Sequence, residues 1–375
     1  MLSLLLIILL CYVFLIGSFI YGFDKVLDYK LKDIAPKTTF TIVVPFRNEA
    51  ENLPPLLKSL SKLNYPKSLY EIILVNDEST DDSLSCIEKE RSILNSISLT
   101  ILNNERQTNA PKKDAITTAI KQAKHQWIVT TDADCILPKY WLDGLDCYIQ
   151  EHKVQMLVAP VTYGQANSFF ERFQLLEILS LQGITIGGFG IKKPLMCNGA
   201  NFAYKTSLFE ALNGFSGNTD IASGDDIFLL EKALSHDKKA VHYIKNPQLT
   251  VTTKPQTTWK ALVAQRVRWA SKTSKYKRIL GKMTGFIVLV TNALLVCLPL
   301  LYVLQIISLK SLLYTFMVKC LIDLLLIFKS ARFFGQEYSL PSYFFACIIY
   351  PFFNVYVAFL SVFSGYKWKD RAFTK

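Results

Sequence analysis

The first stretch of this chain, residues 2–23, has no charged side chain at 22 consecutive positions, and this limits what the N-terminus can become. A helix rises about 1.5 Å per residue, so this length crosses a hydrocarbon core of about 30 Å. The stretch has no basic leading segment and is longer than the apolar part of a signal peptide. We therefore interpret residues 1–23 as an uncleaved transmembrane anchor.

The C-terminal third is apolar as well. Residues 283–309 and 338–366 are free of charge, and residues 311–328 contain only Lys319 and Asp323. The last two are four residues apart, so they can neutralise each other on one helix face. Because 51% of the residues are hydrophobic and 19% are charged, an entirely soluble protein is excluded. Further membrane segments are predicted.

Basic side chains are concentrated between residues 254 and 282, where nine Lys and Arg residues occur without an acidic one. The positive-inside rule places such a block in the cytoplasm, where anionic lipids also attract it. Beside an apolar span, this explanation is better than nucleic-acid binding, so no nucleic acid is expected as a partner. Three C-terminal spans would put the basic tail outside, so we expect one apolar segment to be re-entrant or interfacial. The chain is thus predicted to be a multi-pass protein of the cytoplasmic membrane.

The middle of the chain alternates short β-rich runs with helical patterns. The runs are almost continuously apolar, which is typical of strands covered on both faces. This alternation predicts an α/β domain with a parallel sheet and ligands at the carboxyl ends of its strands. Strands are expected at 39–45, 71–77, 96–102 and 127–134, with helices opening at Glu49, Asp81 and Lys112.

The cysteines and the clustered glycines indicate no zinc site, disulfide scaffold or cofactor loop. Its eight cysteines show no Cys-x-x-Cys spacing, which argues against a zinc site or a disulfide scaffold. Gly187, Gly188 and Gly190 belong to no complete phosphate-binding sequence, so no cofactor loop is predicted there.

The sequence patterns divide the chain into five parts. The parts are an anchor (1–23), an α/β domain (39–253), a basic interfacial helix (254–282), C-terminal transmembrane segments (283–366) and a basic tail (367–375).

Aspartates follow two of the expected strands. Asp77 follows one, and Asp132 and Asp134 follow another at positions i and i+2. A single Asp there is usually a cap or turn residue, but two such carboxylates repel each other unless a cation or donors lie between them. Oxygen ligands in this arrangement suit Mg²⁺ or Mn²⁺ shared with substrate phosphates. Asp132 and Asp134 are therefore a candidate metal site.

Two more motifs follow. Asp225 and Asp226 begin a helical pattern, where carboxylates also interact favourably with the helix dipole. Gln265, Arg268 and Trp269 share one face of a later predicted helix. Arg offers a planar fork for phosphate, and Trp offers a flat face for a sugar.

In order and spacing, these motifs resemble those of the membrane-bound glycosyltransferases of family 2. That family includes synthases of cellulose, hyaluronan, chitin oligosaccharide and poly-N-acetylglucosamine, and transferases acting on ceramide and carotenoid lipids. The resemblance implies a GT-A fold with a Rossmann-like mixed sheet, and transfer from a nucleotide sugar, usually UDP-linked, with inversion. The motifs are VPFRNE (44–49), VNDEST (75–80), PKKDAITTAI (111–120), TDAD (131–134), CNGANFAY (197–204), SGDD (223–226) and QRVRW (265–269).

The resemblance also implies roles on the donor side of the site. Asp77 is expected to hold the uracil, with Pro45 and Glu49 shaping the nucleoside pocket. Lys112 resembles the basic residue near the nucleotide. Pro111 stands where the family commonly has Gly, which leaves the pose of Lys112 open.

The remaining roles concern the metal and the base. Asp132 and Asp134 resemble the family's Asp-x-Asp pair, with Asp134 the metal ligand. Asp226 stands where the family has the catalytic base of a Glu-Asp motif. Asp225 replaces the Glu, so the choice between 225 and 226 stays open.

The predicted activity is that of a hexosyltransferase that uses Mg²⁺ or Mn²⁺ and acts on a membrane-associated lipid or saccharide acceptor. A processive polysaccharide synthase is the alternative within the family, because Gln265, Arg268 and Trp269 match an element associated with synthases. Few C-terminal spans disfavour a polymer channel in one chain, unless membrane partner subunits complete it. A nucleotidyltransferase on a similar sheet and a non-catalytic membrane protein are less favoured.

Overall fold

The computed structural model describes residues 2–363, 365–368 and 371–373. They fall into two compact units, each made of segments that are far apart in the sequence. Of the predicted basic tail, residues 369–370 and 374–375 lie outside the described residues. We call the units the sheet unit (Leu27–Gly164 and Cys197–Lys254) and the helical unit (Met1–Val26, Gln165–Met196 and Pro255–Lys375).

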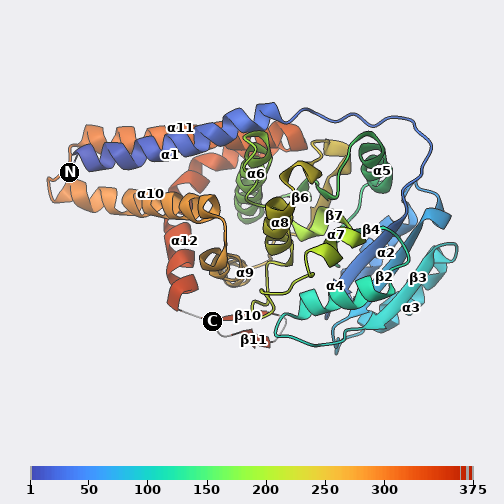
Figure 1. The fold of residues 1–375 in the computed structure, drawn as a ribbon. Helices are drawn as coiled ribbons and strands as arrows, with labels where there is room; N and C mark the ends of the chain where they lie inside the picture. The colour runs from blue at the N-terminus through green and yellow to red at the C-terminus, as the bar shows by residue number, and fades with distance from the viewer. Residues whose placement is uncertain (1, 364, 369–370, 374–375) are drawn as a thin grey trace. The chain divides into compact units, whose positions relative to one another are not determined.

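The sheet unit contains a seven-stranded sheet in the order β3-β2-β1-β4-β7-β5-β8 (Figure 1). The first four strands in this order are parallel, and β7 is antiparallel to both of its neighbours. This mixed α/β sheet confirms the predicted fold class. The strands are β1 (Phe40–Phe46), β2 (Tyr70–Asn76), β3 (Ser98–Asn103), β4 (Trp127–Thr130), β5 (Met156–Val158), β7 (Phe202–Lys205) and β8 (Val241–Tyr243), and β6 (Val161–Tyr163) pairs with β9 (Val251–Thr253).

Strand β1 forms where the sequence is almost continuously apolar, because both of its faces are covered. Ile42, Val43 and Val44 have no exposed surface. The helices of this unit are α2 (Leu53–Ser61), α3 (Ser83–Glu90), α4 (Pro111–Gln122), α5 (Trp141–Glu151), α7 (Thr206–Ala211) and α8 (Asp225–His236).

Strand β4 is shorter than the sequence predicted. It ends at Thr130, where we expected a strand to residue 134. The chain then turns, and the N–H of Cys135 donates to the carbonyl of Asp132 at 3.2 Å. The turn carries Asp132 and Asp134 at the carboxyl end of the sheet.

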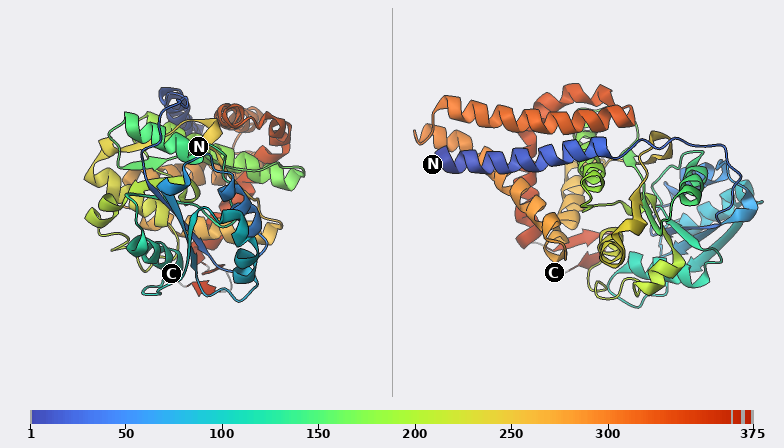
Figure 2. Two further views of the ribbon diagram at one scale, coloured as in Figure 1. Left: turned by 90° about the vertical axis from the view of Figure 1, so that its right-hand side faces the viewer. Right: turned by 45° about the horizontal axis from the view of Figure 1, so that its top comes forward.

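The helical unit holds the apolar segments. Among the described residues, four helices are long and apolar enough to cross a membrane, one near the N-terminus and three near the C-terminus. In Figures 1 and 2, α1 and α11 extend along one direction, and in Figure 1 α12 is steeply inclined to them. The helices are α1 (Leu2–Lys25), α6 (Phe169–Gly190), α9 (Trp259–Ser271), α10 (Ile279–Val303), α11 (Leu309–Phe334) and α12 (Tyr343–Phe363), and a hairpin of β10 (Tyr366–Trp368) and β11 (Arg371–Phe373) follows.

The glycines near residue 190 have a packing role. Helix α6 packs directly on α1, and the two backbones approach closely at Gly22, Gly187 and Gly190. A Cβ atom on Gly187 would lie 2.3 Å from the carbonyl oxygen of Phe19. Small residues of this kind allow helices to associate in membranes. The glycines therefore belong to a helix interface.

Candidate active site

Lys112 lies at the centre of a carboxylate cluster in the sheet unit. It is in the first turn of α4, which begins at Pro111, a favoured first residue of a helix. Its Nζ donates to Asp132 Oδ1 at 2.6 Å and lies 3.3 Å from Asp225 Oδ2. Burial opposes the charge on Lys112, but these two carboxylates outweigh that effect and raise its pKa. One ammonium thus joins the turn after β4 to the start of α8.

Asp134 lies on the same turn, in a strongly acidic environment. Burial, together with the neighbouring carboxylates of Asp132 and Glu49, raises the pKa of Asp134 to about 6. The thiol of Cys135 donates to its Oδ1 at 3.7 Å. Excess negative charge around partly buried oxygen atoms is an environment that favours a cation.

Asp225 and Asp226 begin α8 but make different contacts. Gly224 precedes them with φ of 83°, a left-handed conformation that suits glycine. Asp225 faces Lys112, whereas Asp226 accepts backbone N–H bonds from Gly199 at 3.1 Å and Ile227 at 2.7 Å. Both carboxylates are therefore held in fixed positions beside the Lys112 cluster.

Asp77 follows β2 and is almost fully buried. Its Oδ1 accepts a hydrogen bond from Asn104 Nδ2 at 2.7 Å and lies 3.7 Å from a guanidinium nitrogen of Arg106. Asn104 Nδ2 also donates to the carbonyl of Pro111, while its buried Oδ1 has no hydrogen-bond partner among the described residues. This side chain connects Asp77 to the helix that carries Lys112.

The loop after β1 is tied to the loop after β2. The guanidinium of Arg47 donates to the carbonyls of Asp77 and Glu78, each at 2.7 Å. The backbone N–H of Glu49 donates to Ser83 Oγ at 2.8 Å. Pro45 lies in β1 opposite Val75. Residue 49 thus lies in this loop, and α2 begins at Leu53 rather than at the predicted start.

Gln265, Arg268 and Trp269 lie on α9, which belongs to the helical unit. The buried charged member of this motif is Arg266, which we did not single out from the sequence. Its guanidinium is paired with Glu177 of α6 at 2.8 Å, and it lies over the ring of Trp269. The roles of Gln265, Arg268 and Trp269 toward the donor stay predictions.

The structure therefore brings most of the predicted residues of the sheet unit into one cluster and adds Asn104, Arg106 and Gly199. Asn104 follows β3, so the argument that selected Asp77 from its place after a strand also applies to it. Gly199 contributes only its backbone N–H, which a sequence pattern does not reveal.

A divalent cation fits the donor set of this site. Among the described residues, no group of three or more His, Cys, Asp and Glu side chains is arranged to hold a metal ion by itself. The protein would instead offer the carboxylate oxygens of Asp134 and Asp132, with the other ligands from substrate phosphates and water. Hard oxygen ligands of this kind are those that Mg²⁺ and Mn²⁺ prefer.

Comparisons with known proteins agree on one family. The model of "Glycosyl transferase family 2" matches residues 41–212, and that of "Glycosyl transferase family group 2" matches residues 127–360. The poly(ribitol-phosphate) beta-N-acetylglucosaminyltransferase TarS of Staphylococcus aureus is 33% identical over 119 residues, 32% of this chain and 20% of TarS. The poly-beta-1,6-N-acetyl-D-glucosamine synthase of the same species is 25% identical over 178 residues, 45% of this chain and 41% of the synthase. The matched part is thus less than half of either relative.

A solved structure resembles nearly the whole chain in fold. The mannosyltransferase PcManGT from Pyrobaculum calidifontis, determined with GDP-Man and Mn²⁺, has a TM-score of 0.56 and 17% identity. The match covers 96% of this chain and 99% of that protein. At this identity the likeness concerns the fold.

Proposed function

Because the chain belongs to glycosyl transferase family 2 and is a glycosyltransferase, we propose that it transfers a hexose from a UDP-linked donor to a membrane-associated acceptor, with inversion. The observation that carries the proposal is Lys112, whose ammonium lies between Asp132 and Asp225. This bridge joins the turn that carries Asp132 and Asp134 to the start of α8, where the proposed base lies next to Asp225. Transfer requires both groups beside one reacting bond.

The proposed uracil site is formed by Asp77, with Asn104 and Arg106 beside it. The Asp77 carboxylate can accept the imino N–H of uracil, and the Asn104 Oδ1 is a second buried acceptor. Pro45 and Glu49 would shape the same pocket. Both curated relatives are named for N-acetylglucosamine, so UDP-N-acetylglucosamine is the first donor to test.

The proposed metal is Mg²⁺ or Mn²⁺, held by Asp134 with Asp132. When bound, it supplies positive charge that stabilises the departing diphosphate. Lys112 lies in the same cluster and adds a second positive charge.

We assign Asp226 as the base and Asp225 as the partner of Lys112. Asp226 takes the proton of the acceptor hydroxyl, whose oxygen forms the bond to the anomeric carbon as the bond to the diphosphate breaks. A single displacement of this kind inverts the anomeric centre. The N–H groups of Gly199 and Ile227 orient the carboxylate for this step.

The proposed acceptor is a lipid or a short saccharide at the membrane. Four candidate spans among the described residues make a small enclosure for a growing polymer, which favours single transfer over processive synthesis. Under the positive-inside rule, the sheet unit lies in the cytoplasm with the UDP-sugar pool. We assign the predicted re-entrant or interfacial segment to α12, which contains Pro351 and is inclined to α1 and α11 in Figure 1.

The test is to incubate membranes containing the protein with a panel of nucleotide sugars, and to separate lipid-soluble from polymeric product. UDP release with a labelled lipid-soluble product supports the proposal, and a labelled polymer favours the synthase. Pyrophosphate release from a nucleoside triphosphate, without turnover of any nucleotide sugar, would instead make the chain a nucleotidyltransferase.

A further inference from the structure

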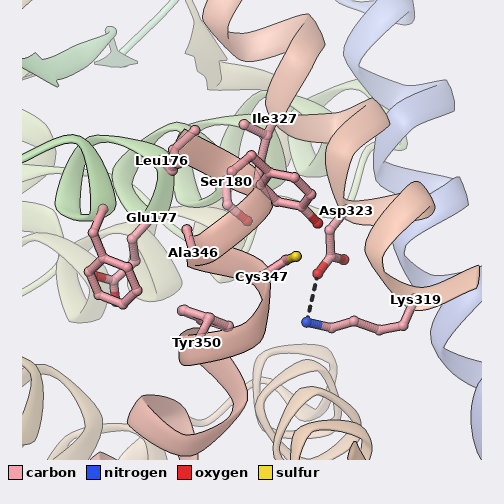
Figure 3. Close-up of a pocket in the computed structure, with 11 residues that line it drawn as sticks. Leu176, Glu177, Ser180, Lys319, Asp323, Ile327, Ala346, Cys347 and Tyr350 are labelled. Atoms are coloured by element: carbon pink, nitrogen blue, oxygen red, sulfur yellow. Dashed lines mark ion pairs between the residues drawn. The ribbon is translucent and has the colours of Figure 1, made fainter. Parts of the chain in front are cut away.

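The helical unit contains a cavity of about 40 Å³ between α6, α11 and α12 (Figure 3). One buried water occupies about 10–15 Å³ on this measure, so the cavity holds about three water-sized groups. Phe173, Leu176, Ile327 and Ala346 form its apolar walls, and Glu177, Ser180, Lys319, Asp323, Tyr343, Cys347 and Tyr350 give it polar groups.

The first polar group is an ion pair on α11. Lys319 is 1% exposed, and its Nζ lies 3.0 Å from Asp323 Oδ2, which bears out the pairing expected from their spacing. The hydroxyl of Tyr12 on α1 donates to Asp323 Oδ1 at 2.6 Å. Lys319 lies about 15 Å along the helix from Leu309, near the middle of a candidate span. Ionisable residues at such depth are costly and commonly functional.

The second polar group comes from α6. Glu177 lines the same cavity and is paired with the buried Arg266, which donates to it through Nε at 2.9 Å. Each of the two carboxylates that line the cavity is therefore paired with a cation. An added phosphate would bring an uncompensated charge into a buried space, which is unfavourable. A neutral group that both donates and accepts hydrogen bonds suits this balance.

We propose that this cavity binds the hydroxyl-bearing head group of a neutral glycerolipid. The lipid hydroxyl donates to a carboxylate oxygen of Asp323 or Glu177 and accepts from the Lys319 ammonium. A hydroxymethyl group fits the volume, and the glycerol carbons lie against the apolar walls. A lipid is favoured over a soluble polyol because α11 and α12 are candidate membrane spans. The inference is independent of the proposed function, because a hydroxyl held by Asp323 or Glu177 is not the hydroxyl from which Asp226 takes a proton.

Binding is measured directly by native mass spectrometry of the full chain in detergent, without nucleotide sugar. The probes are diacylglycerol, triacylglycerol, which lacks the hydroxyl, and phosphatidic acid, which replaces it with a charged phosphate. We expect diacylglycerol to be retained at least tenfold better than the other two. The Asp226→Asn variant should bind it equally well, so a failure of transfer is distinguishable from a failure of lipid binding.

The test variant is Lys319→Met with Asp323→Leu, which removes both charges together and leaves neither one unpaired. Its matched control is Lys329→Met with Asp24→Leu, because that ion pair, at 2.7 Å, also involves a lysine of α11 but lies outside the cavity. The test variant should lose at least tenfold in diacylglycerol binding, and the control should not change.

Ser180→Leu is the second variant. It fills the cavity while keeping both ion pairs, so it tests the site even if the double variant does not fold. Loss of diacylglycerol binding in a folded Ser180→Leu protein supports the proposal. Equal binding of diacylglycerol and triacylglycerol, preference for phosphatidic acid, or unchanged binding by Ser180→Leu would overturn it.

Discussion

Replacing Asp226 by Asn removes the proposed base while keeping the size of the side chain. The carboxylate accepts one N–H bond on each oxygen, from Gly199 at 3.1 Å and from Ile227 at 2.7 Å. An Asn amide keeps one of these bonds and turns its NH₂ toward the other donor. The cost to folding is therefore about one hydrogen bond, roughly 1 kcal/mol, and the protein should stay folded.

The cost to catalysis is larger. Loss of a general base reduces turnover by about 10² to 10⁴, which corresponds to about 2.7 to 5.5 kcal/mol in the barrier. Lys112, which we place on the donor side, keeps its hydrogen bond to Asp132 and its ion pair with Asp225, so the KM for the nucleotide sugar should change little. The measurement is UDP release at saturating acceptor, with kcat and KM determined separately.

Asp225→Asn is the internal control. It removes the carboxylate that lies 3.3 Å from Lys112, but Asp132 at 2.6 Å still holds the ammonium. We expect the donor affinity to fall roughly tenfold, a loss of about 1.5 kcal/mol in binding free energy, and kcat to change little. If Asp225→Asn loses turnover and Asp226→Asn does not, the assignment is wrong by one residue. If neither loses turnover, the two carboxylates only begin a helix.

Three further substitutions test other parts of the chain. Asp134→Ala should abolish turnover in a folded protein, and excess Mg²⁺ or Mn²⁺ should restore activity after EDTA in the wild type only; full wild-type activity in EDTA contradicts the metal site. Lys113→Met removes a buried ammonium that donates to the carbonyls of Asn218 at 2.6 Å and Ile221 at 2.8 Å, in the loop before Asp225. The substitution should lower the free energy of unfolding by about 1 to 3 kcal/mol, and it should affect kcat more than the KM for the donor. A change in KM alone argues against a role of Lys113 in placing the base. Gly187→Ala should destabilise the helical unit by about 1 to 3 kcal/mol in detergent, because the new Cβ meets the Phe19 backbone, whereas Gly17→Ala on α1 meets nothing within 4 Å and should be neutral.

The sequence predicted the elements better than their ends. Strand β1 was expected at 39–45 and occurs at Phe40–Phe46, because an apolar run between polar ends defines a doubly covered strand. The pattern failed after Thr130, where Ala133 is as buried as a strand residue but belongs to a turn. Residue types do not separate a buried strand from a buried turn, so only the backbone shows where the strand ends.

The site was predictable where chemistry is local and not where it depends on distant contacts. Asp132 and Asp134 are neighbours in sequence, so their mutual repulsion is readable from spacing. Arg266 meets Glu177 across 89 residues, and a basic block gives no indication of which Arg becomes buried. Lys113 directly follows Lys112, yet its ammonium donates to backbone carbonyls in the loop before α8. The fold, rather than the motif, separates these roles.

The charges of the assembled site also indicate at which step a cation is needed. One ammonium faces a crowded group of carboxylates, and the donor's diphosphate would add more negative charge to the same region. Without a cation, this repulsion opposes binding of the donor before any bond breaks. EDTA should therefore weaken nucleotide-sugar binding itself, and the loss should be larger for UDP than for uridine, which has no phosphate to repel. The group consists of Glu49, Asp132, Asp134, Asp225 and Asp226 around Lys112.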